Sequence, residues 1–135
     1  MASRLNPYIS YDGDARQAME FYKDVFGGTL VLNSYGEFGQ QDTPMADKIM
    51  HGMLEAPNGF TLMCADTPTD DHKPGNNISV SLSGDDQDLR RYWEQLADGG
   101  TVTMPLEKQM WGDEFGQCVD RFGTPWMVNI GQQQG

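Results

Sequence analysis

The two halves of this 135-residue chain carry the same order of local patterns, about 72 residues apart. In each half, an alternating segment rich in β formers is followed by Asp residues, an amphipathic helical pattern, a Gly-Gly pair and another β-rich segment. The pairs are Gly27-Gly28 and Gly99-Gly100, and glycine after a helical pattern is a typical helix stop. A repeat of this kind predicts two similar modules.

The first half is expected to form a βαβββ module. Its helix has apolar residues at i, i+3 and i+4 spacing between Ala15 and Phe26, and we expect the carboxylate of Asp14 to cap it. A Pro-Asn-Gly turn at residues 57–59 joins the last two strands into a hairpin. The expected strands cover residues 7–11, 29–35, 49–56 and 60–65.

The second half repeats this pattern. Its helical face is marked by Leu89, Tyr92, Trp93 and Leu96, and either Asp85 or Asp86 can cap the helix. The expected strands cover residues 77–82, 101–104, 106–110, 115–120 and 125–130.

The predicted fold is a single α+β domain made of two βαβββ modules paired around a cleft. Module one spans about residues 5–66, a proline-containing linker spans 67–75, and module two spans about 76–130. Neither half has enough apolar surface alone, so the two sheets should curve into a cleft with their helices outside. Such a cleft is where a ligand would bind.

The charge balance excludes several kinds of partner. Twenty acidic residues face nine basic ones, and a net charge of −11 repels nucleic acid and anionic lipid. No apolar run approaches the ~18 residues of a membrane span. The two cysteines, Cys64 and Cys118, have no CxxC spacing, so we expect buried, reduced thiols in a cytoplasmic protein.

Several local patterns together resemble one family over nearly the whole chain. They are Pro7-Tyr8-Ile9, Phe21-Tyr22-x-x-Val25-Phe26-Gly27-Gly28, Ile49-Met50-His51, Leu62-Met63-x-x-Asp66, Trp93-x-x-Leu96-Ala97-x-Gly99-Gly100, Trp111-Gly112-x-x-Phe115-Gly116 and Asp120-Arg121-Phe122-Gly123-x-x-Trp126-Met127-x-Asn129. This ordered set resembles the PhnB-like group of the glyoxalase/bleomycin resistance/dioxygenase, or vicinal-oxygen-chelate, superfamily.

The resemblance implies where a metal would bind. Metal-using members place a His or Gln on the first strand of each module and a Glu on the last strand of each. The corresponding positions here fall at Pro7 or a neighbour, Leu62 or Met63, Asn77, and Met127. Because Pro and Met do not supply the donors these metals prefer, and Asn is a weak ligand, we expect no metal cofactor at the usual place.

His51 is the leading candidate for a polar group in the cleft. Strict alternation puts residues 49, 51, 53 and 55 on one face of their strand and residues 50, 52, 54 and 56 on the other. The second set is small and apolar, as a helix-covered face requires, so the first set should face the cleft. A hydrogen-bonded structural histidine is the alternative.

Aromatic residues and methionines complete the expected site. Trp111 and Trp126 fit a pocket wall or the core equally well. The expected ligand-binding residues are Tyr8, Ser10, Tyr35, His51, Met53, Met63, Asn77, Trp111 and Trp126. No catalytic residue is assigned, because the sequence has no Ser-His-Asp or Cys-His motif.

These observations favour a small-molecule-binding protein, or an enzyme of unidentified substrate, that lacks the usual metal. Two alternatives remain: a metal-dependent lyase or dioxygenase with ligands at shifted positions, and a non-catalytic structural dimer. A homodimer is expected in each case, because the apolar sheet faces exceed what two helices can cover.

Overall fold

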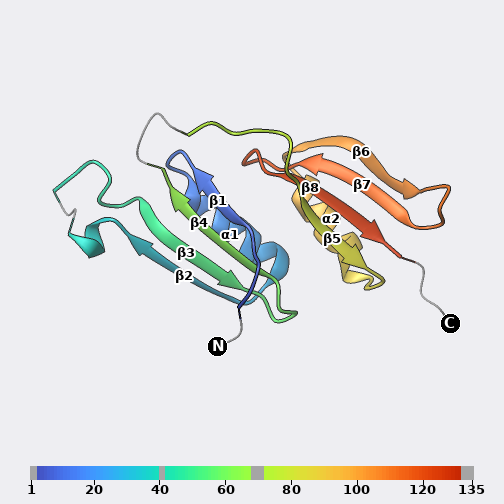
Figure 1. Ribbon diagram of the computed structural model, residues 1–135, viewed down its shortest axis with the longest axis horizontal. Helices are drawn as coiled ribbons and strands as arrows, with labels where there is room; N and C mark the ends of the chain where they lie inside the picture. Colours follow the sequence, from blue (N-terminus) through green and yellow to red (C-terminus); the bar gives the residue numbers. More distant parts are fainter. Residues whose placement is uncertain (1–2, 40–41, 68–71, 132–135) are drawn as a thin grey trace. The chain divides into compact units, whose positions relative to one another are not determined.

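A computed structural model describes residues 3–39, 42–67 and 72–131, and the chain divides into two compact units, Met1–Lys73 and Pro74–Gly135 (Figure 1). The division falls inside the predicted linker, of which residues 68–71 lie outside the described residues. Each unit is a βαβββ module, which confirms the predicted α+β fold. A cleft formed by pairing the two sheets stays a prediction.

The first unit contains a four-stranded mixed sheet in the order β1-β4-β3-β2. Strand β1 is parallel to β4, and the other neighbours are antiparallel. Its elements are β1 (Tyr8–Tyr11), α1 (Ala15–Phe26), β2 (Thr29–Ser34), the short 3₁₀ helix η1 (Gly36–Phe38), β3 (Ile49–Glu55) and β4 (Thr61–Asp66).

The second unit has the same topology, with its sheet in the order β5-β8-β7-β6. Again the first strand is parallel to the last, and the remaining pairs are antiparallel. Its elements are β5 (Val80–Gly84), α2 (Asp88–Ala97), β6 (Thr101–Lys108), β7 (Glu114–Val119) and β8 (Pro125–Ile130).

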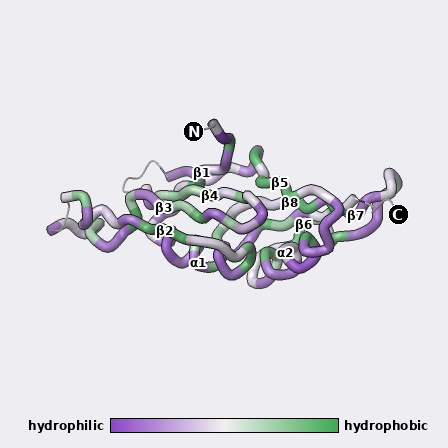
Figure 2. The backbone as a smooth tube through the Cα atoms, turned by 90° about the horizontal axis from the view of Figure 1, so that it is seen from below, coloured by the Kyte–Doolittle hydropathy of each residue, from purple (hydrophilic) through white to green (hydrophobic). Residues whose placement is uncertain are grey.

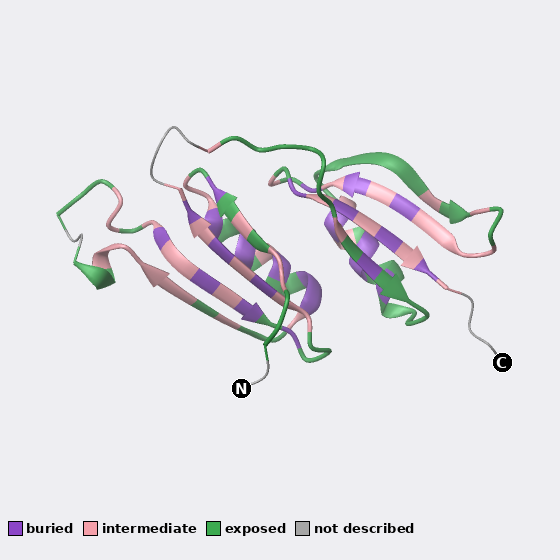
Figure 3. Ribbon diagram, in the orientation of Figure 1, coloured by how far each residue is buried: buried purple, intermediate pink, exposed green. Residues whose placement is uncertain are grey.

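In each module the helix lies along one side of the module's own sheet (Figure 2), and the buried residues of the helix and of the sheet form the core between them. Along β4 and β8, buried and half-buried residues alternate, so only every second side chain belongs to this core (Figure 3). The buried side of α1 is the predicted one: Ala15, Ala18, Met19, Tyr22, Val25 and Phe26. Every second side chain of the strands therefore packs against the apolar side of the helix, whose residues recur about every 3.6 positions, and together they form one apolar layer.

A carboxylate distant in sequence supports the start of α1. We expected Asp14 to cap this helix, but its side chain makes no capping hydrogen bond. Instead the buried carboxylate of Asp66, at the end of β4, accepts hydrogen bonds from the backbone N–H groups of Gly13 (2.9 Å), Ala15 (3.0 Å) and Ile49 (2.9 Å). Asp66 thus ties the helix start to β3 and β4, a long-range contact that local spacing does not reveal.

The Gly-Gly pairs allow the chain to pass close to a neighbouring strand. A Cβ atom on Gly28 would lie 2.1 Å from the carbonyl oxygen of Glu55, and one on Gly100 would lie 2.2 Å from that of Val119. Both contacts are far shorter than any real carbon–oxygen contact. The second glycine of each pair is therefore required by close backbone approach, at matching places in the two modules.

A bulge in β3 changes the predicted alternation. Asn33 pairs with His51, but the next residue of β2, Ser34, pairs with Ile49, so Met50 is an extra residue. The prediction that Ile49 shares a face with His51 is therefore wrong. Ile49 is 1% exposed and joins the helix-side core, because the extra residue Met50 shifts the alternation by one position between Ile49 and His51.

Two strand boundaries in the second unit also differ from the prediction. Residues 101–104 and 106–110 were expected as separate strands, but β6 is continuous across Pro105, with two register shifts. An edge strand tolerates proline, since one of its sides needs no hydrogen-bond donor. Strand β5 begins at Val80 rather than at residue 77. The next hydrogen bond between β5 and β8 would need the backbone N–H group of residue 125 as its donor, and this residue is a proline, which has none.

In the described part of the chain, none of the helices α1, η1 and α2 is long and apolar enough to cross a membrane.

Candidate functional site

The strongest candidate site lies on the side of the first sheet that points away from α1, which we call the open face. Gly52, Leu54, Leu62 and Cys64 are buried on the helix side, so their neighbours on β3 and β4 point to the open face. The strand register then assigns to the open face Tyr8, Ser10, Val31, Asn33, His51, Met53, Glu55, Thr61, Met63 and Ala65.

Tyr8 and His51 lie next to each other on this face although they come from β1 and β3. Their ring centroids are 6.1 Å apart, with an angle of 35° between the ring planes. Strand β4 lies between them, with Met63 as the direct partner of Tyr8 and Ala65 two residues further along the same face. His51 is half-buried and Tyr8 is 52% exposed, so a bound molecule could reach both.

The phenol of Tyr8 is a hydrogen-bond donor at neutral pH. Burial raises the pKa of Tyr8 above its ordinary value, and the nearby Cys64 and Tyr35 raise it further. A raised pKa keeps the proton on the phenol, so Tyr8 can donate to an acceptor on a ligand but cannot serve as a phenolate base.

Tyr35 lies next to the open face, at one end of the predicted site residues of the first module. It follows β2, and its hydroxyl donates a hydrogen bond to the carbonyl oxygen of Asp66 over 2.8 Å. That hydrogen bond fixes the half-buried ring beside the end of β4. Tyr35 therefore belongs to the border of the open face.

Met53 and Met63 form the apolar part of the face. They are direct cross-strand partners on β3 and β4, and Tyr8 is in turn the partner of Met63 on β1. Both methionines are half-buried. Flexible thioether side chains of this kind adapt to the shape of a ligand.

Asn33 is a residue of this face that our sequence analysis missed. It is the direct partner of His51 on β2, and its amide adds both a donor and an acceptor beside the imidazole. Alternation within the predicted strand at residues 29–35 puts Asn33 and Leu32 on opposite sides of the strand. The pairing of Asn33 with His51, however, could not be read from the sequence.

Trp126 belongs to the core of the second module, which corrects the pocket-wall interpretation. It is 1% exposed, and its indole N–H donates a hydrogen bond to the Asp120 carboxylate over 2.8 Å. Its neighbours on the same side of β8, Val128 and Ile130, are buried as well. The carboxylate satisfies the one polar atom of the indole, so full burial is tolerated.

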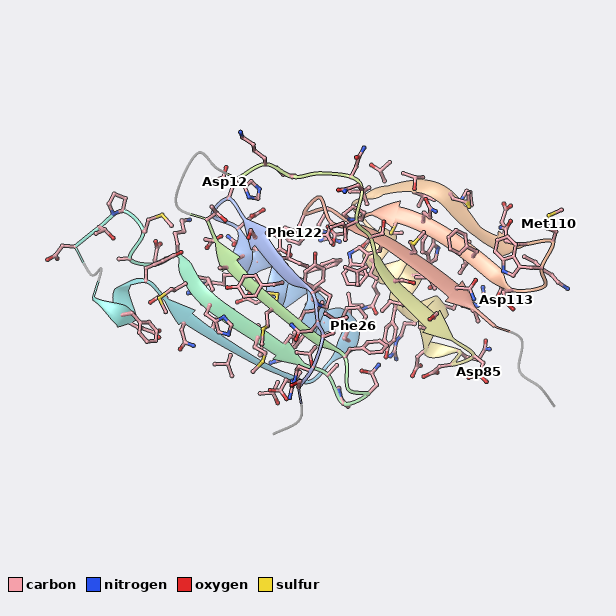
Figure 4. All side chains as sticks on the ribbon, in the orientation of Figure 1. Asp12, Phe26, Asp85, Met110, Asp113 and Phe122 are labelled. Atoms are coloured by element: carbon pink, nitrogen blue, oxygen red, sulfur yellow. The ribbon has the colours of Figure 1, made fainter. Side chains whose placement is uncertain are left out.

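The other two predicted residues of the second module are exposed. Asn77 precedes β5 and is not part of the sheet. Trp111 is 59% exposed in the turn between β6 and β7, where its ring meets Phe115 edge-on at 6.0 Å. Its neighbour Met110 projects at the tip of this turn (Figure 4).

The register also corrects two of the positions expected for metal ligands. Ser81 pairs with Met127 as Tyr8 pairs with Met63, so Ser81, not Asn77, occupies the position corresponding to Tyr8. Leu62 is excluded because it is buried on the helix side.

The donors present do not fit the metal ion that the resemblance implies. On the sides of β1, β4, β5 and β8 away from the helices stand Tyr8, Ser10, Met63, Ala65, Ser81, Ser83, Met127 and Asn129. Hydroxyls, thioethers and one amide are not the imidazole and carboxylate ligands of zinc or manganese sites. Within residues 3–39, 42–67 and 72–131, no group of three His, Cys, Asp or Glu side chains could hold a metal ion.

Both cysteines are free, buried and poorly nucleophilic. Burial and the neighbouring Asp66 raise the pKa of the Cys64 thiol to about 12. Burial and Asp120 raise that of Cys118 to about 11. At neutral pH both remain thiols, and a thiol is a weak nucleophile and metal ligand.

Comparison with known proteins agrees with this architecture. Residues 4–128 match the family described as Glyoxalase/Bleomycin resistance protein/Dioxygenase superfamily. Protein YjdN of Escherichia coli (strain K12) is 29% identical over 142 residues, which cover 96% of this chain and 97% of YjdN.

Two solved structures share the fold over almost their full length. Protein PA1353 from Pseudomonas aeruginosa is 35% identical, with a TM-score of 0.86, and the match covers 98% of this chain and 100% of that one. The PhnB protein from Bacillus cereus is 20% identical, with a TM-score of 0.78 and coverage of 96% and 100%. The second likeness concerns the fold alone.

Proposed function

Because this chain belongs to the glyoxalase/bleomycin resistance protein/dioxygenase superfamily, we propose that it binds a small organic molecule on the open face of its first module. The binding residues are Tyr8, Ser10, Tyr35, His51, Met53 and Met63. Binding does not depend on the divalent metal of the metal-using relatives, since the donors at the corresponding positions do not suit one.

The observation that carries this proposal is the contact between Tyr8 and His51. An imidazole and a phenol from two non-adjacent strands lie 6.1 Å apart, ring to ring, on the side of the sheet away from the helix. Packing of the core does not require either group there. Polar groups that converge beside apolar side chains are the usual composition of a ligand site.

The side chains define the chemistry of the ligand. Tyr8 supplies a protonated donor, His51 supplies a donor or an acceptor, and Met53 and Met63 supply an adaptable apolar surface. A planar or partly apolar molecule with at least one hydrogen-bond acceptor satisfies all of them. Trp111 and Asn77 belong to the second unit, and their part in the same site stays a proposal.

The first alternative, a metal-dependent lyase or dioxygenase, requires ligands at shifted positions, because Met63, Ser81 and Met127 supply no hard or imidazole ligand at the usual ones. The non-catalytic dimer requires that the open face bind no small molecule at all. A homodimeric, cytoplasmic protein is compatible with each function and stays a prediction.

A fragment screen by heteronuclear NMR tests the proposal. We expect the ligands that bind to shift backbone signals of β1, β3 and β4 around Tyr8 and His51. His51→Ala should weaken a hit about tenfold, the equivalent of one lost hydrogen bond to a ligand. It should leave the melting temperature nearly unchanged, because the side chain lies outside the core.

His72→Ala is the matched control, since it removes the other histidine of the chain, which precedes the second module. Equal effects of the two substitutions, or hits confined to the second module, would refute the proposed site. Binding that requires added zinc or manganese would favour the metal-dependent alternative.

A further inference from the structure

Three soft or borderline donors stand together on the open face, and we propose that they form a site for a monovalent thiophilic metal ion, Cu(I). The donors are the imidazole of His51 and the thioethers of Met53 and Met63. Thioether and imidazole ligands select Cu(I) over the divalent ions that carboxylates bind. The inference rests on the proposed function only in using the same accessible face, and the occupant is a different one.

The sheet geometry brings the three side chains within reach of one ion. Met53 and Met63 are direct cross-strand partners, so their Cβ atoms stand about 5 Å apart. His51 lies two residues before Met53 on the same side of β3, a spacing of about 7 Å along the strand. A methionine side chain is long enough for its sulfur to meet a neighbouring imidazole across this span.

The exposure of these residues suits a site that exchanges its ion. His51, Met53 and Met63 are each half-buried, which leaves the donors open to an arriving ion. The backbone beneath them belongs to the central strands β3 and β4. A site on strands is held more precisely than a site on loops.

Tyr8 adds an aromatic ring beside the donors. Its ring centroid lies 6.1 Å from that of His51, and its backbone partner is Met63. Aromatic rings attract cations. The ring therefore adds a favourable contact for a monovalent cation without supplying a hard anionic ligand.

The neighbouring charges favour a cation but do not complete a divalent site. Glu55 is the acidic residue on this side of β3, two residues beyond Met53 and on the far side of it from His51. Cys64 points to the helix side and is buried there, away from the three donors. The chain carries a net charge of −11, which raises the local concentration of cations without selecting one.

The second module provides an internal comparison. Gln117 pairs with Met127 there as Met53 pairs with Met63, and Phe115 occupies the position of His51. The three matching positions therefore hold one thioether and no imidazole, and the second thioether of that region, Met104, lies on β6 as the partner of Gln117. A site that depends on the His-Met-Met set should exist in the first module and be missing at this place in the second.

Competition for Cu(I) tests the inference. The whole chain is titrated, without oxygen and with a reductant, against a coloured Cu(I) chelate such as the bicinchoninate complex. We expect one equivalent of Cu(I) to move to the protein. Met53→Leu, Met63→Leu and His51→Ala should each weaken binding at least about tenfold, since even outer-shell partners of a ligand cost that much. Met127→Leu should have no effect.

A second measurement uses Ag(I), a redox-inert monovalent ion that prefers the same soft ligands as Cu(I), and follows the NMR signals of the methionine methyl groups. Ag(I) should shift the methyl signals of Met53 and Met63 and leave that of Met127 in place. Equal weakening by Met127→Leu, or binding that survives in Met63→Leu and is lost in Cys64→Ala, would overturn the inference. If the protein does not compete for Cu(I) while organic fragments still bind at His51, the metal site is wrong and the proposed function stands.

Discussion

Asp66 joins three backbone N–H groups from two parts of the first module, so its removal should be costly. We expect Asp66→Ala to lower the free energy of unfolding by about 3 kcal/mol, because buried donors without an acceptor cost 1–3 kcal/mol each and these are coupled. Urea denaturation followed by circular dichroism measures the change.

Asp14→Ala is the control for this prediction, since Asp14 occupies the N-cap position of α1 without a side-chain hydrogen bond. Its loss should cost less than about 0.5 kcal/mol, below the usual effect of a working cap. If Asp14→Ala were the more damaging change, the local capping that the sequence suggests would have to replace the long-range contact of Asp66.

The Cys64 thiol should make stability depend on pH in the alkaline range. Its pKa in the folded protein is about 12, against an ordinary value of 9.0. The unfolded chain therefore loses the proton first, so stability is complete below pH 9.0 and falls as pH rises toward the folded pKa. The free energy of unfolding should decline less steeply above pH 9.0 in Cys64→Ala than in the natural chain.

The quantity to compare is the slope of the free energy of unfolding against pH. Its absolute value is unsuitable, because Cys64→Ala also leaves a small cavity that destabilises the protein at every pH. Tyrosines and lysines titrate in both proteins and so cancel in the difference. Parallel slopes between pH 9.0 and 11 would mean that the thiol is not held protonated by its surroundings.

At the scale of elements, the repeated pattern correctly predicted both helices, because these depend on local periodicity. Gly27 is the C-cap of α1 as expected, whereas α2 already ends at Ala97 with Asp98 as its C-cap, just before the second Gly-Gly pair. The pattern did not predict the bulge at Met50, which depends on how β2 pairs with β3. The bulge left His51 on the open face and moved Ile49 into the core. A one-residue insertion of this kind is decided by tertiary pairing, and no residue type in Ile49-Met50-His51 signals it.

The Gly28 contact yields a prediction about the connection between α1 and β2. Both Gly28 and Gly59 have positive φ, 100° and 90°, but only at Gly28 would a Cβ meet a neighbour, the Glu55 carbonyl at 2.1 Å. Gly59→Ala should cost about 1 kcal/mol for the backbone conformation alone. Gly28→Ala should cost at least about 2 kcal/mol more, because overpacking forces backbone shifts.

Thermal and urea unfolding of the two glycine variants separate these contributions. Similar losses in Gly28→Ala and Gly59→Ala would indicate that the strand pair separates easily at Glu55. The close approach would then not be needed to hold α1 against the sheet.

At the scale of the whole molecule, the fold was predictable but the site only in part. Tyr8, Ser10, His51, Met53 and Met63 were expected together and share one face of the first sheet. Trp126 could not be assigned from sequence, because an indole beside glycines suits a pocket or a core equally well. Its burial follows from the carboxylate of Asp120, six residues earlier but brought close by a turn.

The last prediction concerns assembly. Large apolar side chains remain exposed on the sheets of both modules: Tyr8, Val31, Val102 and Met104. Strands β2 and β6 each have a partner on one side only within their own sheet. Apolar faces and edges of this kind favour symmetric association, so we expect a homodimer of about twice 15.1 kDa in sedimentation equilibrium.

Salt dependence distinguishes this dimer from one held by ion pairs. Two chains that each carry a net charge of −11 repel each other, and salt screens the repulsion over a Debye length of about 10 Å at 0.1 M. The dimer should therefore strengthen as salt is raised from about 0.01 M to about 0.2 M. Dissociation by added salt would show that charge pairs, not apolar faces, hold the subunits together, and a 15.1 kDa species at all salt concentrations would refute the dimer.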